Sequence, residues 1–192
     1  MVLLWCLGFG AWKFAFGVIA LFNDLTEASM VAAMGSRGIP SVLLAEDSEN
    51  DILMFRRAAR RAKFNQPLSV VTNGEEVIAY LSGDGKFRDR DQYPLPGLVL
   101  LDLKMPRMNG FEVLQWLRQQ PQFAALQVVV LSSSDEIRDI NRAYQLGANS
   151  FLVKPLSFDE FVGMLEALRS YCLRVSQTVG RRRVVEPAGV AA

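Results

Sequence analysis

From Ser41 onward, short apolar runs of four or five residues alternate with amphipathic segments of ten or more residues. A short run that is apolar throughout is typical of a strand covered on both faces, whereas apolar residues three or four positions apart are typical of a helix with one buried face. The alternation therefore predicts five βα units that form a doubly wound parallel sheet. The predicted strands are residues 41–45, 68–72, 98–101, 127–131 and 150–153.

The amphipathic segments predict five helices, and their ends carry helix signals. Three helices are predicted to begin with a capping box, a polar residue followed three positions later by Glu: Asn73 with Glu76, Ser133 with Glu136, and Ser157 with Glu160. The other two are residues 50–64 and residues 111–120, the latter stopped by a proline, and Gly147 is a suitable C-terminal cap for the helix that ends at residue 146. Residues 83–97 are predicted to form a polar loop.

Both ends of the chain lie outside this pattern. Residues 1–22 are apolar apart from Lys13 and are long enough to span a membrane, but a central lysine costs about 2.5–3.5 kcal/mol on insertion and no basic residue precedes the run. We therefore interpret residues 1–38 as an extension produced by a misplaced start or as a disordered segment, with a membrane anchor as the alternative. The folded domain is predicted at residues 39–175, followed by a disordered tail at 176–192.

Composition excludes several classes of function. The 21 Lys and Arg residues balance the 20 Asp and Glu residues, so no overall basic field is available to attract nucleic acid. The chain has no histidine, which excludes Ser-His and Cys-His nucleophiles, His-ligated zinc and a phosphohistidine of its own. Its two cysteines, Cys6 and Cys172, are too far apart to indicate a disulfide framework or a metal-binding motif, and they fit a reducing compartment.

Polar residues follow four of the predicted strands. Glu46 and Asp47 follow the first strand, Asp102 the third, Ser132 the fourth and Lys154 the fifth. The carboxyl ends of parallel strands meet at one edge of the sheet, so these side chains are expected to converge there. Clustered carboxylates repel one another unless a cation neutralises them, and oxygen ligands favour Mg²⁺. A metal-held carboxylate beside a lysine and a hydroxyl can attack a phosphoryl group and form an aspartyl phosphate.

With these residues in view, residues 39–175 resemble the response regulator receiver family. Glu46-Asp47 in VLLAEDSEND resembles the acidic pair of that family, Asp102 in VLLDLKMPRMNG its phosphoacceptor and Ser132 in VVVLSSSD its hydroxyl switch. Lys154-Pro155 in FLVKPL completes the set, and the spacings agree: thirty positions separate Asp102 from Ser132, and twenty-two separate Ser132 from Lys154.

The resemblance implies further properties. The fold would be a flavodoxin-like, five-stranded parallel sheet with strand order 2-1-3-4-5. The metal would be Mg²⁺, bound by Glu46, Asp47, Asp102 and the backbone carbonyl of Lys104. Phe151 corresponds to the aromatic residue whose rotation reports phosphorylation, and the lysine-proline peptide is usually cis in such proteins.

A finer resemblance, carried by the loop at 83–97 and by the segments GANSFLVKPLSFDEF and LRSYC, is to single-domain regulators of bacterial phytochrome-type histidine kinases. It implies a cytoplasmic phosphoacceptor, not an enzyme, whose partner is a histidine kinase or a histidine phosphotransfer protein. Several such regulators dimerise, and Tyr171, Leu173 and Val175 could supply the apolar surface for a homodimer.

Two alternatives differ in class. A phosphatase with an aspartyl nucleophile needs a second acid two positions after the first, where this chain has Lys104. The alternative that stays open is an adaptor that keeps the receiver fold but binds its partners independently of phosphorylation.

Overall fold

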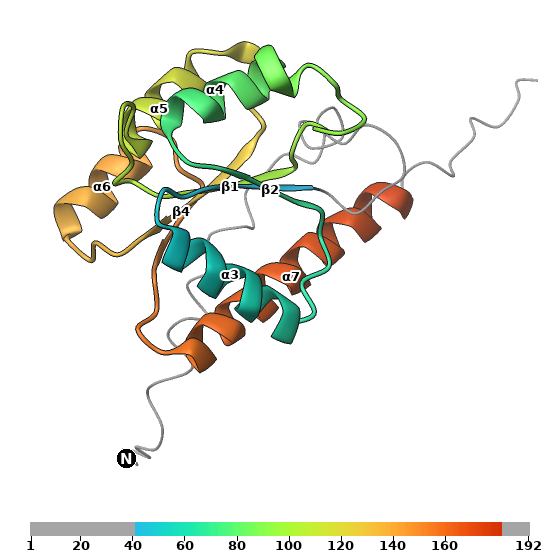
Figure 1. Ribbon diagram of the computed structural model, residues 1–192, viewed down its shortest axis with the longest axis vertical. Coiled ribbons are helices and arrows are strands. Elements are labelled where there is room, and N and C mark those ends of the chain that lie inside the picture. The colour runs from blue at the N-terminus through green and yellow to red at the C-terminus, as the bar shows by residue number, and fades with distance from the viewer. Residues whose placement is uncertain (1–40, 182–192) are drawn as a thin grey trace, which may run out of the picture.

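The structure is a computed structural model that describes residues 41–181, with side chains as far as residue 170. Its sheet contains five parallel strands in the order β2-β1-β3-β4-β5, as the family resemblance implied (Figure 1). The strands are β1 (Val42–Ala45), β2 (Leu68–Val71), β3 (Leu98–Leu101), β4 (Gln127–Ser132) and β5 (Ser150–Val153).

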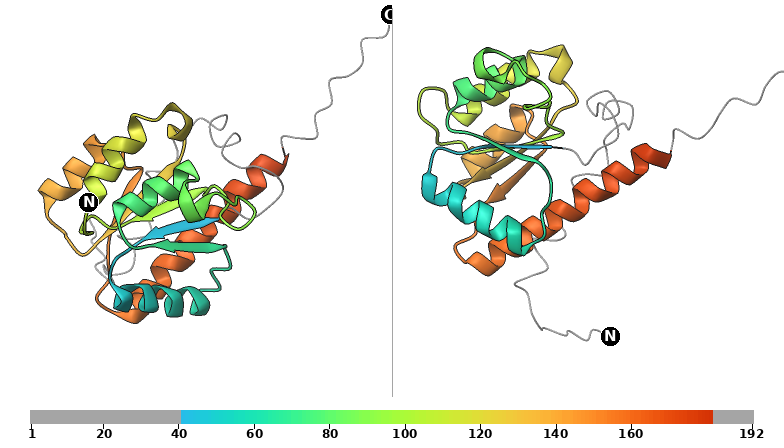
Figure 2. Two further views of the ribbon diagram at one scale, coloured as in Figure 1. Left: turned by 45° about the horizontal axis from the view of Figure 1, so that its top comes forward. Right: turned by 45° about the vertical axis from the view of Figure 1, so that its right-hand side comes forward.

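Two layers of helices cover the sheet. Helices α3 (Glu49–Arg61) and α7 (Phe158–Arg181) lie on one face, and α4 (Gly74–Ser82), α5 (Gly110–Arg118) and α6 (Ile137–Gln145) lie on the other (Figures 1 and 2). Two short 3₁₀ helices, η1 (Gly85–Phe87) and η2 (Pro121–Phe123), follow α4 and α5. The order of elements confirms the predicted βα units.

The core consists of two apolar layers, one on each side of the sheet. Leu43 and Ala45 of β1 pack with the helices of the α4–α6 face, whereas Val42 and Leu44 pack with α3 and α7. All four side chains are buried, because a central parallel strand is covered on both faces. The continuous apolar runs in the sequence are the direct consequence of this arrangement.

Several helix caps differ from the sequence predictions. The box predicted at Ser133 is wrong: α6 begins only at Ile137, after Glu136, and no side chain caps it. The Asn73 cap is only half of a box, because its side chain accepts the N–H of Glu76 but the Glu76 carboxylate accepts the N–H of Thr72 instead. The complete capping box belongs to α5, between Asn109 and Glu112, where the sequence analysis predicts none.

The other predicted helix ends agree with the structure in part. The N–H of Glu160 donates to Ser157 Oγ at 3.3 Å, which confirms one of the two bonds of the box predicted before α7. Gly147 follows the last residues of α6 with φ +92°, a backbone angle that favours glycine. Predicted helix 50–64 is shorter in the structure, since Ser48 caps α3 from Glu49 onward and the helix ends at Arg61.

The segment 83–97 is a packed structure, not the simple polar loop that its composition predicts. Phe87 is buried and lies between the rings of Tyr80 and Tyr93, with centroid distances of 5.0 and 5.2 Å. Arg90 donates to the carbonyl oxygens of Tyr80 and Leu81, the last turn of α4. The guanidinium therefore supplies the donors that the end of this helix lacks.

A second arginine, Arg118 at the end of α5, joins the helix to two other segments. Its Nε and Nη2 donate to the carbonyl oxygen of Gly147 at 3.0 and 2.6 Å, and Nη1 donates to that of Ala124 at 3.2 Å. Nη2 also donates to the side chain of Asn149 at 3.2 Å. Burial lowers the pKa of Arg118, but a guanidinium remains protonated at neutral pH.

The predicted N-terminal extension, including the candidate anchor at residues 1–22, lies outside the described residues, as does the tail from residue 182. Residues 176–181, predicted as part of that tail, belong to α7. Among residues 41–181, no helix combines the length and the apolar character needed to cross a membrane.

Candidate functional site

The carboxyl ends of β1 and β3 bring three predicted carboxylates together. The two strands are neighbours, with Ala45 opposite Leu101, so Glu46 and Asp102 follow at the same level of the sheet. Glu46 and Asp102 are buried, whereas Asp47 is exposed. The N–H of Leu103 donates to Asp102 Oδ1 at 2.7 Å and fixes this carboxylate.

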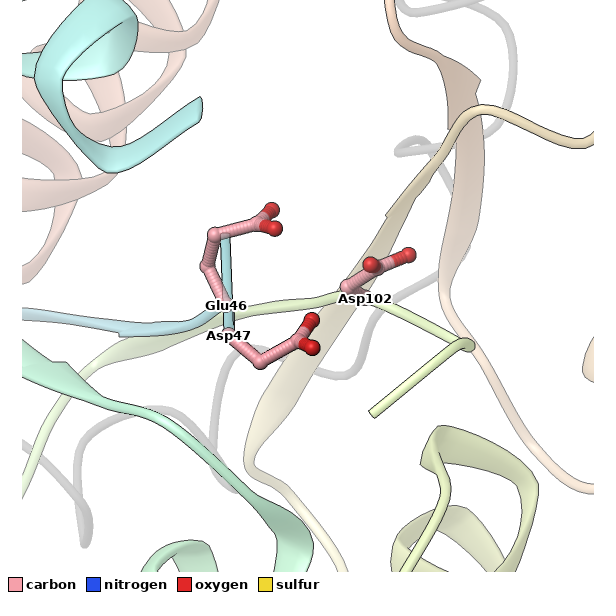
Figure 3. Close-up of side chains that lie close together, drawn as sticks. All are labelled: Glu46, Asp47 and Asp102. Carbon is pink, nitrogen blue, oxygen red and sulfur yellow. The ribbon is translucent and has the colours of Figure 1, made fainter. Parts of the chain in front are cut away.

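These carboxylates could hold a divalent cation. One oxygen from each of Glu46, Asp47 and Asp102 lies within 4.8 Å of the others, and Figure 3 shows the three side chains close together at the ends of the two strands. Carboxylate oxygens are the ligands preferred by hard divalent cations, and a buried pair of like charges needs a counter-ion. The residues present therefore fit the metal that the sequence predicts.

Lys154 brings a positively charged side chain to these carboxylates. It follows β5 and its backbone N–H donates to the carbonyl oxygen of Ser132 at 2.8 Å, which aligns it with the end of β4. Its side chain is only 14% exposed, and Nζ donates to Glu46 Oε2 at 2.6 Å and to Asp51 Oδ2 at 2.8 Å. Asp102 Oδ2 lies farther away, at 3.5 Å from Nζ.

The peptide bond between Lys154 and Pro155 is trans, as are all peptide bonds among the described residues. This differs from the cis bond that the family resemblance implied. The trans form is the intrinsic preference of a bond before proline, by about 0.5–1 kcal/mol.

Burial and charge shift the pKa values of the two central groups. Burial lowers the pKa of Lys154, but hydrogen bonds to Asp51 and Glu46 and the charge of Asp102 outweigh that effect, so its pKa is raised. Burial raises the pKa of Glu46, and the hydrogen bond from Lys154 opposes this rise without cancelling it. A cation held by the same carboxylates would oppose the rise further.

The predicted switch residues, Ser132 and Phe151, lie in the neighbouring strands β4 and β5. Ser132 ends β4 and is fully buried, and its Oγ accepts the N–H of Ser134 at 3.3 Å. Ser134 is buried too, and its hydroxyl donates to Asp139 of α6 at 2.8 Å. Phe151 is half-buried against the core layer of the α4–α6 face. Lys104, whose backbone carbonyl is the predicted metal ligand, is exposed.

Asp51 is the site residue that the sequence reading missed. It is the third residue of α3, a position where an acidic residue usually serves only the helix N-terminus. The signal was its position in the sequence. Asp51 lies in the first turn of α3, only four residues after Asp47, so its carboxylate stays near the end of β1. Asp51 and Lys154 also line a pocket of about 180 Å³ whose other walls include apolar Met54, Phe55 and Phe161.

The start of α5 packs against the backbone of Asp102 and Leu103, directly after β3. The N–H of Gly110 donates to the carbonyl oxygen of Leu103 at 3.1 Å. A Cβ atom on Gly110 would clash with the carbonyl oxygen of Asp102 and lie 2.8 Å from Cα of Leu103, closer than real Cβ contacts allow. Only a residue without a side chain therefore allows α5 to approach the backbone that carries Asp102 this closely.

The fold and these strand-end residues agree with one family. Residues 42–166 match the response regulator receiver domain, and this chain belongs to that family. It is similar to the response regulator Rcp1 of Synechocystis sp. (strain ATCC 27184 / PCC 6803 / Kazusa), with 30% identity over 132 residues, which are 69% of this chain and 88% of Rcp1. The structure of the Mn²⁺-bound form of Rcp1 superimposes with a TM-score of 0.62 and 27% identity, covering 80% of this chain and 99% of Rcp1.

Two further solved structures support the finer resemblance to phytochrome-type regulators. RPA3017, a response regulator in red light signalling of R. palustris, has a TM-score of 0.66 and 38% identity, covering 69% of this chain and 92% of RPA3017. The phosphorylated cyanobacterial phytochrome response regulator RcpA has a TM-score of 0.64 and 28% identity, covering 71% of this chain and 95% of RcpA. The similarity to phytochrome-type regulators predicted from the sequence is thereby confirmed.

Proposed function

We propose that this chain accepts a phosphoryl group on Asp102 from a histidine kinase or a histidine phosphotransfer protein in a Mg²⁺-dependent reaction. The observation that carries the proposal is that one oxygen of the Asp102 carboxylate has no short hydrogen bond. It belongs to the three-carboxylate cluster and faces Lys154, yet its Oδ2 makes no short bond to the ammonium, at 3.5 Å. Glu46, by contrast, has Oε2 bonded to Lys154 at 2.6 Å and Oε1 bonded to the N–H of Ser48.

Each group has a role in the transfer. An Asp102 oxygen attacks phosphorus, the bond from phosphorus to the donor histidine nitrogen breaks, and that nitrogen keeps the electron pair. Glu46, Asp47, Asp102 and the backbone carbonyl of Lys104 would hold Mg²⁺, which when bound neutralises charge on the phosphoryl oxygens. Lys154 supplies the second positive charge at the same oxygens.

We propose that Ser132 and Phe151 form the conformational switch. The Ser132 hydroxyl would donate to a phosphoryl oxygen on Asp102, and its present bond from the N–H of Ser134 would then break or lengthen. Because Ser134 is bonded to Asp139, this change would reach α6 directly. Phe151 packs beneath α6 and would change rotamer as that segment moves.

Labelling with a small phosphodonor and Mg²⁺ tests the proposal. Wild-type protein should form an acyl phosphate, and Asp102→Asn should form none while keeping its circular dichroism spectrum, because the nucleophilic oxygen is gone. Asp84→Asn, an exposed acid in the loop after α4, is the matched control and should label normally. Full labelling of Asp102→Asn would refute the mechanism, and a wild-type protein that never labels would favour the phosphorylation-independent adaptor.

The similarity to the phytochrome response regulator RcpA supports a phytochrome-type histidine kinase as the partner. A cytoplasmic location for the receiver is part of the same proposal. The chain's own chemistry would then be limited to its phosphorylation and dephosphorylation, and it would not be an enzyme acting on other substrates.

Homodimerisation through the last helix is a further part of the proposal. Helix α7 continues to Arg181, well past Leu168, which is its last core residue among those whose side chains are described. The candidate contacts Tyr171, Leu173 and Val175 lie beyond residue 170, outside the part of the chain whose side chains are described. Sedimentation that finds only monomer at high concentration, with and without phosphorylation, would contradict the dimer.

A further inference from the structure

The ammonium group of Lys154 has three N–H donors, and the structure shows unequal use of them. Two go to carboxylates at hydrogen-bonding distance, 2.6 Å to Glu46 and 2.8 Å to Asp51. The third carboxylate neighbour, Asp102, lies at 3.5 Å, which is beyond the length of a strong charge-assisted hydrogen bond. Two anchors therefore fix the ammonium and leave its third donor available on the side of Asp102.

The two anchors differ in what else they contact. Glu46 belongs to the cluster with Asp47 and Asp102, so a divalent cation bound there would draw on its oxygens. Asp51 is not a member of that cluster. It is held from α3, where its backbone N–H donates to Ser48 Oγ at 3.3 Å, and its side chain is 39% exposed. Asp51 is thus the anchor of Lys154 that remains when the carboxylate cluster binds a cation.

We propose that Asp51 is a positioning residue that holds the Lys154 ammonium with one N–H directed toward Asp102, and so sets the rate of phosphoryl transfer. The proposal rests on the proposed function of Asp102. Without Asp51, Lys154 would keep only Glu46 as a close partner, and its ammonium would be free to leave the position in which it meets the incoming phosphoryl oxygens. Misplacement of a charged group at a reacting centre lowers rate even where the group is retained.

The competing explanation is that Asp51 only stabilises the N-terminus of α3. An acid in the first turn of a helix does so through the helix dipole, whether or not it contacts another side chain. Glu49 provides the matched control, since it lies in the same turn and is exposed. Among the side chains of residues 41–170, the structure shows no ion pair of Glu49. Glu49→Gln removes the same charge from the same helix end without touching Lys154.

The experiment compares Asp51→Asn with Glu49→Gln in two measurements. The first is the rate of labelling by a small acyl phosphate at saturating Mg²⁺. The second is the ¹⁵Nζ and ammonium proton signal of Lys154 in ¹⁵N-lysine protein without phosphodonor, assigned with Lys154→Arg. Asp51→Asn should slow labelling roughly ten-fold and broaden or shift the ammonium signal, because a charge-assisted bond that protects it is weakened. Glu49→Gln should leave both unchanged.

Three results would overturn the proposal: labelling of Asp51→Asn at the wild-type rate, an unchanged Lys154 signal in that variant, or equal slowing in both variants. Failure of the proposed function has a different signature. If wild-type protein does not label at all, Asp102 is not a phosphoacceptor under these conditions. The ammonium signal then still decides whether Asp51 holds Lys154, and an unchanged signal rejects it.

Discussion

Two partly buried cations, Lys154 and Arg118, hold different parts of this molecule together by different means. Lys154 binds carboxylates, Glu46 and Asp51, at the carboxyl end of the sheet. Arg118 binds backbone carbonyl oxygens, chiefly that of Gly147, at the far end of α6, together with one side-chain amide. Both cations are largely removed from water, and both join segments that are distant in sequence.

The difference lies in the acceptors. Carbonyl oxygens are neutral, belong to the fixed backbone and cannot accept a proton, so the Arg118 contacts have one stable state. Carboxylates are charged, and each can exchange Lys154 for a metal ion, a proton or a new hydrogen-bond donor. A buried cation surrounded by carboxylates therefore indicates a site that can change, whereas one surrounded by carbonyls indicates a structural joint.

Replacing Lys154 should have the largest effect. In Lys154→Ala, Glu46 and Asp102 stay buried without their cation, which should lower the free energy of unfolding by about 3 kcal/mol in metal-free buffer. Mg²⁺ should restore part of this stability, since it neutralises the same carboxylates. Residual labelling should remain, but the Mg²⁺- and phosphodonor-dependent spectral change should be lost. Urea unfolding with and without Mg²⁺ measures the first effect, and an unchanged spectral response would contradict the second.

Arg118→Ala should be less destabilising, by about 2 kcal/mol, because several carbonyl oxygens lose donors but no charge is left buried. Mg²⁺ should give this variant no more stability than it gives the wild type. Its labelling rate should match the wild type at a temperature where both are folded. Arg118→Lys should recover little, since an ammonium cannot reproduce the forked contacts of a guanidinium. Recovery of stability by Mg²⁺ in Arg118→Ala would erase the distinction between the two cations.

The smallest effect is expected at a third, more exposed pair, Glu76 with Lys86, whose Nζ lies 2.7 Å from the carboxylate. The hydrogen bond from Lys86, followed by that from the N–H of Thr72, holds the pKa of Glu76 below its usual value. A carboxyl group with a lowered pKa stabilises the fold above about pH 4.5, and that stabilisation is lost as the pH falls through the lowered value.

Glu76→Gln should therefore cost about 0.5–1 kcal/mol at pH 7 and nothing once both proteins are fully protonated at acidic pH. Thermal unfolding across this pH range, repeated in high salt, is the measurement. A difference between the two proteins that persists unchanged at low pH would show that the charge of Glu76 is not its source.

The sequence predicted the strands and the residues at their carboxyl ends because these depend on short, local patterns. Asp102 ends an apolar run, and Lys154 follows another, so topology alone brings them together. The order of the strands needed more than pattern: it came from the family resemblance.

What the sequence could not predict depends on contacts between distant segments. Arg118 is twenty-nine positions from Gly147, and nothing near either residue indicates that they meet. Ser133 and Glu136 have the spacing of a capping box, but the hydroxyl of Ser134 bonds Asp139 instead, and α6 begins later. Asp51 lies at the start of the predicted helix 50–64, where an acidic residue is explained by the helix N-terminus alone. Its bond to Lys154 therefore has no signal of its own in the sequence.

The contact between Gly110 and the backbone after Asp102 limits how the sequence of this region can vary. By helix propensity alone, alanine would be favoured over glycine within a helix by about 1 kcal/mol. Here any side chain would clash with the carbonyl oxygen of Asp102, so this gain in stability is not available. An exposed position of the connecting loop such as Lys104 can diversify, whereas position 110 cannot. For protein design, the strand end, the loop length and this glycine form one unit that has to be transplanted together.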